Sequence, residues 1–97
     1  MVETAWTPSP WAISPHDGEG LMVMGDRNAI TVADCGLSAV ATRGQQAANA
    51  RLIAAAPSLH AACAAAEDFI AAIDSDAARQ VYAQLHAALA RARGETL

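Results

Sequence analysis

The sequence has no lysine, one phenylalanine and one tyrosine among its 97 residues, and it has few large aliphatic side chains. Alanine fills 26 positions, so the apolar fraction of 54% overstates the volume available for a core. A chain of this length buries about 65% of the surface of its unfolded form, which suffices for one core but not for two. We therefore predict a single domain (1–97) with a thin core and closely approaching helices.

Basic side chains are also scarce. The six arginines are outnumbered by ten acidic residues, and the formal net charge is −4. A nucleic-acid binder neutralises phosphates with a basic face, which this composition does not supply unless the fold brings Arg27, Arg43 and Arg51 together. We therefore expect no direct contact with nucleic acid.

Cys35 and Cys63 are the only cysteines, and the N-terminus shows no charged leader followed by an apolar run. No window reaches the roughly 18 uninterrupted apolar residues of a membrane span. We expect a cytoplasmic protein that makes no membrane contact, in which both thiols stay reduced.

The first third of the chain is typical of short strands. Pro8, Pro10 and Pro15 exclude a helix there. Short apolar runs alternate with turn-forming residues; the runs cover residues 11–13, 21–24 and 30–32, and the turns cover 16–20 and 25–28. This pattern predicts a three-stranded antiparallel meander. Such short strands need a covering layer, so one face should pack against helices through Trp11, Ile13, Ile30 and Val32.

Residues 35–43 are predicted to cross irregularly from the meander to the helices, with Gly36 and Gly44 as hinges. Leu37 and Val40 are expected to point inward. The domain thus divides into a meander and crossing (1–44) and a helical segment (45–97).

Three helices are predicted in that helical segment. The first covers residues 45–56, and Pro57 suits the first turn of a second helix that runs to about Ile73. Asp74, Ser75 and Asp76 supply an N-cap for the third, which Gly94 ends. Apolar residues recur with helical spacing in two stripes: Leu59, Ala62, Cys63, Ala66, Phe69, Ile70 and Ile73, then Ala78, Val81, Tyr82, Leu85, Ala88, Leu89 and Ala92. We predict an antiparallel hairpin sealed by these stripes, in an α+β fold.

Catalytic and metal-binding patterns are weak. His60 and Cys63 have a spacing that could place two ligands on one metal, with His86 as a third, but Cys63 lies within the apolar stripe and the histidines flank it. The pairs His16–Asp17 and Asp34–Cys35 fall in turn-rich segments, where aspartate is expected for backbone reasons. We therefore expect no enzymatic activity, no cofactor and no metal.

Three surfaces could bind a partner, one of them being the exposed turns of the meander. Glu67, Asp68, Asp74 and Asp76 could form an acidic patch that meets an arginine-rich protein, although Asp74 and Asp76 also suit a helix N-terminus. The alternative is a homodimer through helix 57–73, whose outer face is smooth because of its alanines (Ala61, Ala64, Ala65 and Ala72). Asn49 is expected on the buried side of the first helix, as a side-chain brace between helix and sheet.

Residues 49–59, Asn-Ala-Arg-Leu-Ile-Ala-Ala-Ala-Pro-Ser-Leu, resemble a helix-proline-helix signature of small accessory proteins from tailed phages and prophages, including those of lambdoid early regions. Asn49, Arg51 and Pro57 are the matching positions, which we interpret as scaffold. The resemblance implies a phage protein, in a group that includes anti-CRISPR proteins and other inhibitors of host defence. It suggests a protein-binding module that occludes a surface of a host complex, the homodimeric accessory protein being the alternative.

Overall fold

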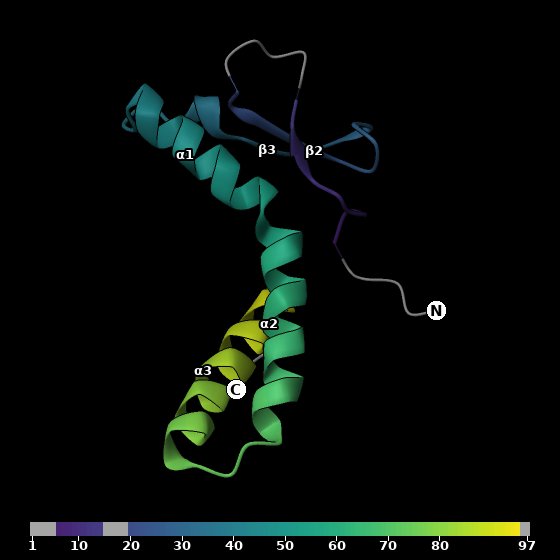
Figure 1. The fold of residues 1–97 in the computed structure, drawn as a ribbon. Coiled ribbons are helices and arrows are strands. Elements are labelled where there is room, and N and C mark those ends of the chain that lie inside the picture. Colours follow the sequence, from purple (N-terminus) through teal and green to yellow (C-terminus); the bar gives the residue numbers. More distant parts are fainter. Residues whose placement is uncertain (1–5, 15–19, 96–97) are drawn as a thin grey trace. The chain divides into compact units, whose positions relative to one another are not determined.

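The computed structural model describes residues 6–14 and 20–95. A three-stranded antiparallel sheet is followed by three α-helices, so the predicted α+β class is confirmed (Figure 1). The contacts divide the chain into two compact units: unit 1 is Met1–Pro57 and unit 2 is Ser58–Leu97. The first helix therefore belongs with the sheet, and not with the two helices that follow it.

The sheet has the order β1-β2-β3, with β1 at Ala12–Ile13, β2 at Met22–Gly25 and β3 at Ile30–Asp34. Both pairings are antiparallel, and Val23 lies opposite Ile13 on one side and Ala33 on the other. The predicted strands agree with these bounds to within two residues. Most of the predicted turn at 16–20 lies outside the described residues, and Gly20, which follows the gap, has a φ of +75°.

The turn between β2 and β3 is confirmed at its predicted place and has an unusual backbone. Asp26, Arg27 and Asn28 all have positive φ, at 50°, 55° and 65°. The Asp26 amide donates to the Pro8 carbonyl oxygen at 2.9 Å, which ties the turn to the segment before β1. Gly25 lies under that segment, because a Cβ there would lie 2.8 Å from both Thr7 Cγ2 and Trp11 Cδ1.

Helix α1 (Arg43–Ala54) covers the sheet. It starts two residues before its predicted start because Thr42 and Gln45 form a capping box, in which each side chain accepts from the other residue's backbone amide. The core of unit 1 consists of Leu21, Val23 and Ala50, and the last two are fully buried. The small Ala50 side chain lets α1 approach the sheet closely.

The predicted core face of the meander is therefore partly wrong. Trp11, Ile13 and Val32 are half-buried, whereas Ile30 is exposed. The central strand β2 is paired on both edges, so its neighbours cover it best, and the buried side chains come from that strand and from Leu21 just before it.

Leu37 and Val40 do not point inward; they are 80% and 95% exposed. The chain leaves β3 through a 3-10 helix, η1 (Cys35–Leu37), which the Asp34 carboxylate caps by accepting from the Gly36 amide at 3.0 Å. The residues directly after this turn are exposed, whereas Gln46 and Ala50 of α1 occupy buried positions.

The amide brace between α1 and the crossing exists, but Asn49 does not supply it. Asn49 is exposed, whereas Gln46 is buried and its Nε2 donates to the Ser38 carbonyl oxygen at 3.0 Å. Gln46 and Ala50 are four residues apart and share the buried side of the helix, while Asn49 is turned about 100° away from Ala50.

Unit 2 contains α2 (Ala56–Ala71), except for its first two residues, and α3 (Asp76–Ala92); the two helices are in contact and run in opposite directions (Figure 1). Pro57 lies in the first turn of α2, as predicted. The Ser75 hydroxyl accepts from the Ala78 amide at 3.1 Å and caps α3, and Gly94, with a φ of +79°, follows its C-terminus. The predicted hairpin and the predicted residues at its helix ends are confirmed.

The stripe predicted to seal α2 is only partly covered. Its less exposed side carries His60, Cys63, Glu67 and Ile70, whereas Leu59, Phe69 and Ile73 are exposed, Phe69 by 72%. On α3 the less exposed side carries Ala78, Tyr82, Leu85 and Leu89, as predicted, while Val81, Ala88 and Ala92 are exposed. The apolar surface of α2 is wider than one neighbouring helix can cover, so one row of it stays outside.

Candidate functional site

The three residues considered for a metal are placed differently from one another. Cys63 and His60 are half-buried on α2, whereas His86 is exposed on α3. His86 Nδ1 lies 3.2 Å from Glu67 Oε2, and the imidazole stacks on Tyr82 with 5.8 Å between ring centroids. Within residues 6–14 and 20–95, no three His, Cys, Asp or Glu side chains are arranged to hold a metal ion.

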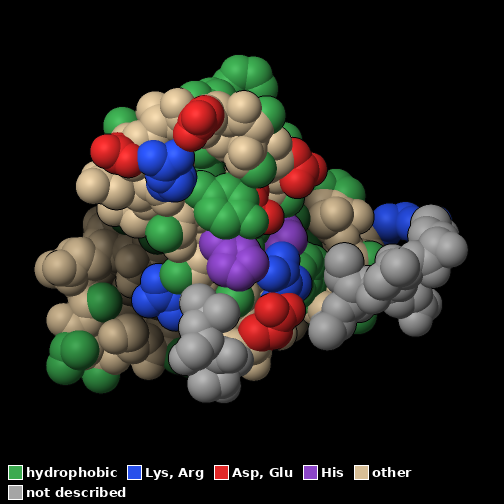
Figure 2. Space-filling view, turned by 90° about the horizontal axis from the view of Figure 1, so that it is seen from below, with side chains coloured by type: hydrophobic (Ala, Val, Ile, Leu, Met, Phe, Trp, Pro, Cys, Tyr) green, Lys and Arg blue, Asp and Glu red, His purple; other side chains and the backbone are tan. Residues whose placement is uncertain are grey.

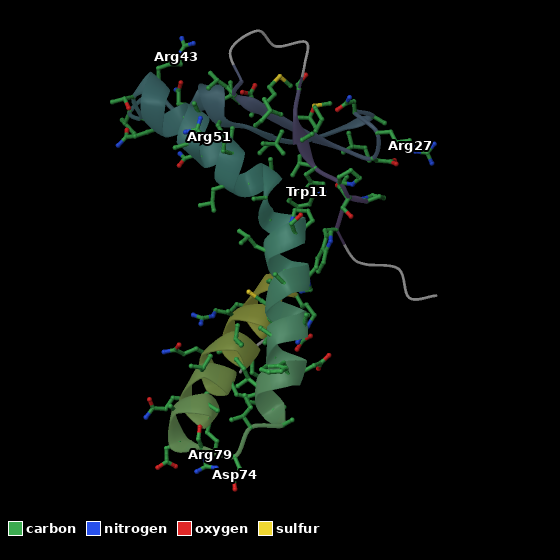
Figure 3. The ribbon with its side chains drawn as sticks, in the orientation of Figure 1. Trp11, Arg27, Arg43, Arg51, Asp74 and Arg79 are labelled. Atoms are coloured by element: carbon green, nitrogen blue, oxygen red, sulfur yellow. The ribbon has the colours of Figure 1, made fainter. Side chains whose placement is uncertain are left out.

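The acidic residues proposed to bind a partner are largely paired within unit 2. Asp74 lies 2.8 Å from Arg79, and Asp76 contacts the same guanidinium group; Figure 3 shows Asp74 and Arg79 together at the closed end of the hairpin. Glu67 is engaged by His86 on the less exposed side of α2. Asp68 is exposed, and no ion pair is seen for it among the described residues. The four acids therefore carry a weaker field than their count suggests.

Charged groups of both signs are nevertheless paired along the hairpin. Figure 2 shows histidine, arginine and acidic side chains close together on the face seen from below. The C-terminal end contributes Arg93 and Glu95, 2.8 Å apart, and this hydrogen bond raises the pKa of Arg93 and lowers the pKa of Glu95. Opposite charges are thus interleaved on this side.

The three arginines that nucleic-acid binding would require are not brought together. Figure 3 shows Arg43 and Arg51 extending from α1, while Arg27 extends from the turn between β2 and β3 on the far side of the sheet. Their separation leaves unit 1 without the continuous basic face that phosphate binding requires.

A different surface of unit 1 is apolar and exposed. Residues 37–42, which we call the apolar loop, connect η1 to α1 and read Leu-Ser-Ala-Val-Ala-Thr without a charge. Leu37 and Val40 are its large side chains, and they are the two most exposed large hydrophobic residues among those the structure describes.

The backbone of the apolar loop is held at three places. At its start the Asp34 side chain caps η1, at its end the Thr42–Gln45 capping box fixes the first turn of α1, and between them the Gln46 amide donates to Ser38. The two exposed apolar side chains thus lie on a backbone that is tied to η1 and α1 by side-chain hydrogen bonds.

Sequence reasoning missed the apolar loop because Leu37 and Val40 were assigned to the core by residue type alone. The signals that would have revealed it are the two capping patterns, Asp34-Cys35-Gly36 and Thr42-x-x-Gln45, which fix both ends of a six-residue segment. The segment between them is too short to turn its side chains back under α1.

Comparison with known proteins identifies the origin of the chain. Residues 1–96 match the family model described as Salmonella phage P22 protein Y8K6. The chain belongs to this family. The phage origin implied by the resemblance of residues 49–59 is thereby confirmed, while the family description states no activity.

Comparisons with curated proteins and with solved structures found no match for this member of the P22 protein Y8K6 family. No helix in the described part of the chain is both long enough and apolar enough to cross a membrane. What it does has therefore to be argued from its surfaces.

Proposed function

We propose that this phage protein is a non-catalytic binding module that inhibits a host defence complex, in the manner of an anti-CRISPR protein, by covering a surface of that complex. The observation that carries the proposal is the apolar loop, where Leu37 and Val40 are held in solvent on a braced backbone. Membership of a phage family and the net charge of −4 support the same interpretation.

The apolar loop supplies the main binding energy in this proposal. Burying a large aliphatic side chain contributes about 1.5–3 kcal/mol, so Leu37 and Val40 together contribute on the order of 3–6 kcal/mol before the costs of association. The braces from Asp34, Thr42 and Gln46 lower those costs, because the loop does not have to be ordered when the partner binds.

The acidic residues have a secondary role. Complexes that grip nucleic acid present basic surfaces, and Glu67, Asp68, Asp74 and Asp76 would attract such a surface even though Arg79 and His86 offset part of their charge. Asp68 is the most available of them. Charges outside the buried part of an interface mainly raise the association rate, so we assign these acids a role in the rate of binding rather than in its strength. We propose the host cytoplasm as the site of action.

Affinity purification of the tagged chain from host cells with active defence systems tests the proposal. The wild-type chain should recover a specific host complex, and the double variant Leu37→Ser, Val40→Ser should lose it. Leu52→Ser is the matched control, because Leu52 is exposed in the same unit but lies on α1. Tryptophan fluorescence from Trp6 and Trp11 verifies that unit 1 is folded in each variant.

Recovery of no specific host complex would contradict the proposed function, as would a double variant that retains the complex. A defence assay then separates binding from inhibition: expression of the wild-type chain should protect an infecting phage, and expression of the double variant should not.

A further inference from the structure

One side of α2 carries an exposed apolar row that nothing in unit 2 covers. Leu59, Ala62, Ala66 and Phe69 follow one another at intervals of three or four residues on α2, and Ile73 lies two residues beyond the end of that helix; we call these five residues the α2 seam. Ala66 at its centre is half-buried, and the other four are exposed. A phenylalanine that is 72% exposed on a regular helix places a large apolar area in water.

The α2 seam is free of charge along its whole length. Glu67 and Asp68 are the charged residues of α2, and both project away from the seam. On α2, each seam residue from Leu59 to Phe69 comes directly before a residue on the less exposed side of that helix. On α3, Val81 and Ala88 likewise come directly before Tyr82 and Leu89. In two antiparallel helices, such preceding positions project to the same side of the pair, so α3 extends the apolar face.

The order of large and small residues along the α2 seam fits a second copy of the same seam in the antiparallel direction. Leu59 then lies opposite Ile73, Ala62 lies opposite Phe69, and Ala66 lies opposite its own counterpart. The bulky ring meets a small side chain, and the central alanines permit close approach. A parallel copy would oppose Phe69 with Phe69 and Ala62 with Ala62, leaving a clash beside a void.

The exposed area is enough for a weak association. The exposed parts of the seam residues together with Val81 and Ala88 come to on the order of 500 Å² per copy, so two copies would bury at most about 1,000 Å², the size of a weak, transient interface. We propose that the hairpins of two chains pair antiparallel through the α2 seam, about a two-fold axis at Ala66. This proposal does not rest on the proposed function, since the apolar loop lies in unit 1.

Sedimentation of the full chain tests the association, over concentrations from roughly one to several hundred micromolar as suits an interface of this size. The wild-type chain should form dimers, and Phe69→Glu should shift the dissociation constant upward by at least about a hundredfold, because it buries a charge at the seam. Leu52→Glu, a charge added at an exposed leucine of unit 1, should leave the dimer unchanged. A chain that stays monomeric throughout, or a dimer that Phe69→Glu does not weaken, overturns the proposal.

Disulfide trapping tests the direction of pairing independently of any effect on folding. In a chain with Cys35→Ser and Cys63→Ser, Leu59→Cys and Ile73→Cys variants are prepared separately, mixed and oxidised. The antiparallel seam predicts a crosslink between the Leu59→Cys chain and the Ile73→Cys chain, and little crosslinking of either variant with itself. Predominant self-crosslinking would show a parallel arrangement, and no crosslinking would show that the seam is not the interface.

The two proposals can fail separately. The variant Leu37→Ser, Val40→Ser should lose the host complex while still dimerising. Phe69→Glu should become monomeric while its apolar loop stays intact. Loss of dimerisation in the loop variant would show that the apolar loop, and not the α2 seam, joins the two copies.

Discussion

The two units are both rich in alanine but bury their side chains to different extents. Unit 1 buries Leu21, Val23, Ala50 and the Gln46 amide between a small sheet and one helix. Unit 2 consists mainly of two helices, α2 and α3, which are both longer than α1. Among its residues that the structure describes, the buried ones are Leu89 and Ala90. Regular helices with good caps thus do not by themselves make a core.

The difference follows from the shapes that pack. A sheet presents a broad surface, and a small residue such as Ala50 lets a helix settle closely on it. Two helices meet along a single line of contact, so only one row of side chains on each is covered. The second apolar row of α2 remains outside, and the proposed pairing of two copies rests on this row.

The largest effect expected from breaking the core of unit 1 comes from Leu21→Ala. Leu21 is almost fully buried, and removing such a side chain costs about 2–5 kcal/mol of unfolding free energy. Urea unfolding followed by tryptophan fluorescence measures it, since Trp6 and Trp11 both lie in unit 1. Phe69→Ala, followed by helical circular dichroism below the dimerisation range, is the counterpart in unit 2 and should change the unfolding free energy by less than about 0.5 kcal/mol. Similar losses in the two variants would show that Phe69 is buried in solution.

Gly25→Ala should have the next largest effect. The new methyl group would lie 2.8 Å from Trp11 Cδ1 and from Thr7 Cγ2, and overpacking of this kind costs about 1–3 kcal/mol. Gly44→Ala is the matched control, because Gly44 is exposed in the first turn of α1 and should stabilise the chain by about 0.5–1 kcal/mol. Thermal unfolding by circular dichroism should therefore show melting temperatures that move in opposite directions. A neutral Gly25→Ala would mean that the Trp11 ring can move aside freely.

Gln46→Met tests the brace of the apolar loop. The substitution keeps the length of the side chain but removes the donor to Ser38, and a half-buried carbonyl without its partner costs about 1–2 kcal/mol. Hydrogen exchange of the amides in residues 37–42 should speed up in this variant. Asn49→Ala, at the exposed position first expected to hold the brace, should leave that exchange unchanged. Equal exchange in both variants would remove the case for a preformed loop.

Ser75→Ala should weaken unit 2 rather than unit 1. The hydroxyl accepts from the Ala78 amide at the start of α3, and loss of such a cap costs about 1 kcal/mol. Helical circular dichroism should report the loss, whereas the tryptophan transition of unit 1 should not move. Ser75→Asp, which keeps an acceptor at the cap, should restore the stability, and a failure to do so would point to a role for Ser75 other than capping.

Most of the fold was predictable from local patterns. As predicted, Pro57 lies in the first turn of α2, Ser75 caps α3 and Gly94 follows its C-terminus. The strands likewise follow the apolar runs between turns. These features depend on a few neighbouring residues, and each has a direct physical cause in a cap or in a restricted backbone angle.

What could not be predicted depends on the relative rotation of packed elements. Whether Asn49 or Gln46 is the buried amide depends on how α1 is rotated about its own axis. In the same way, the rotation of α2 about its axis decides whether Phe69 or Ile70 faces α3. An alanine-rich helix offers several nearly equivalent faces, so its sequence does not select one. The partner surfaces depended on these choices, and the apolar loop and the α2 seam emerged only with the structure.

The smallest expected effect concerns the exposed C-terminal end of unit 2. The hydrogen bond from Arg93 lowers the pKa of Glu95, so the ion pair contributes its full stabilisation above the ordinary pKa of a glutamate and loses it as the pH falls through the lowered value. NMR titration of the Glu95 carboxyl group should show this lowered pKa, and Arg93→Gln should return it toward its ordinary value. Because both groups are open to solvent, high salt should produce much of the same change in the wild-type chain, in contrast to the braced loop of unit 1, whose Gln46 amide should not respond to salt. A Glu95 pKa that stays low in the Arg93→Gln variant would mean that another group, such as His86 nearby, holds this end of the hairpin.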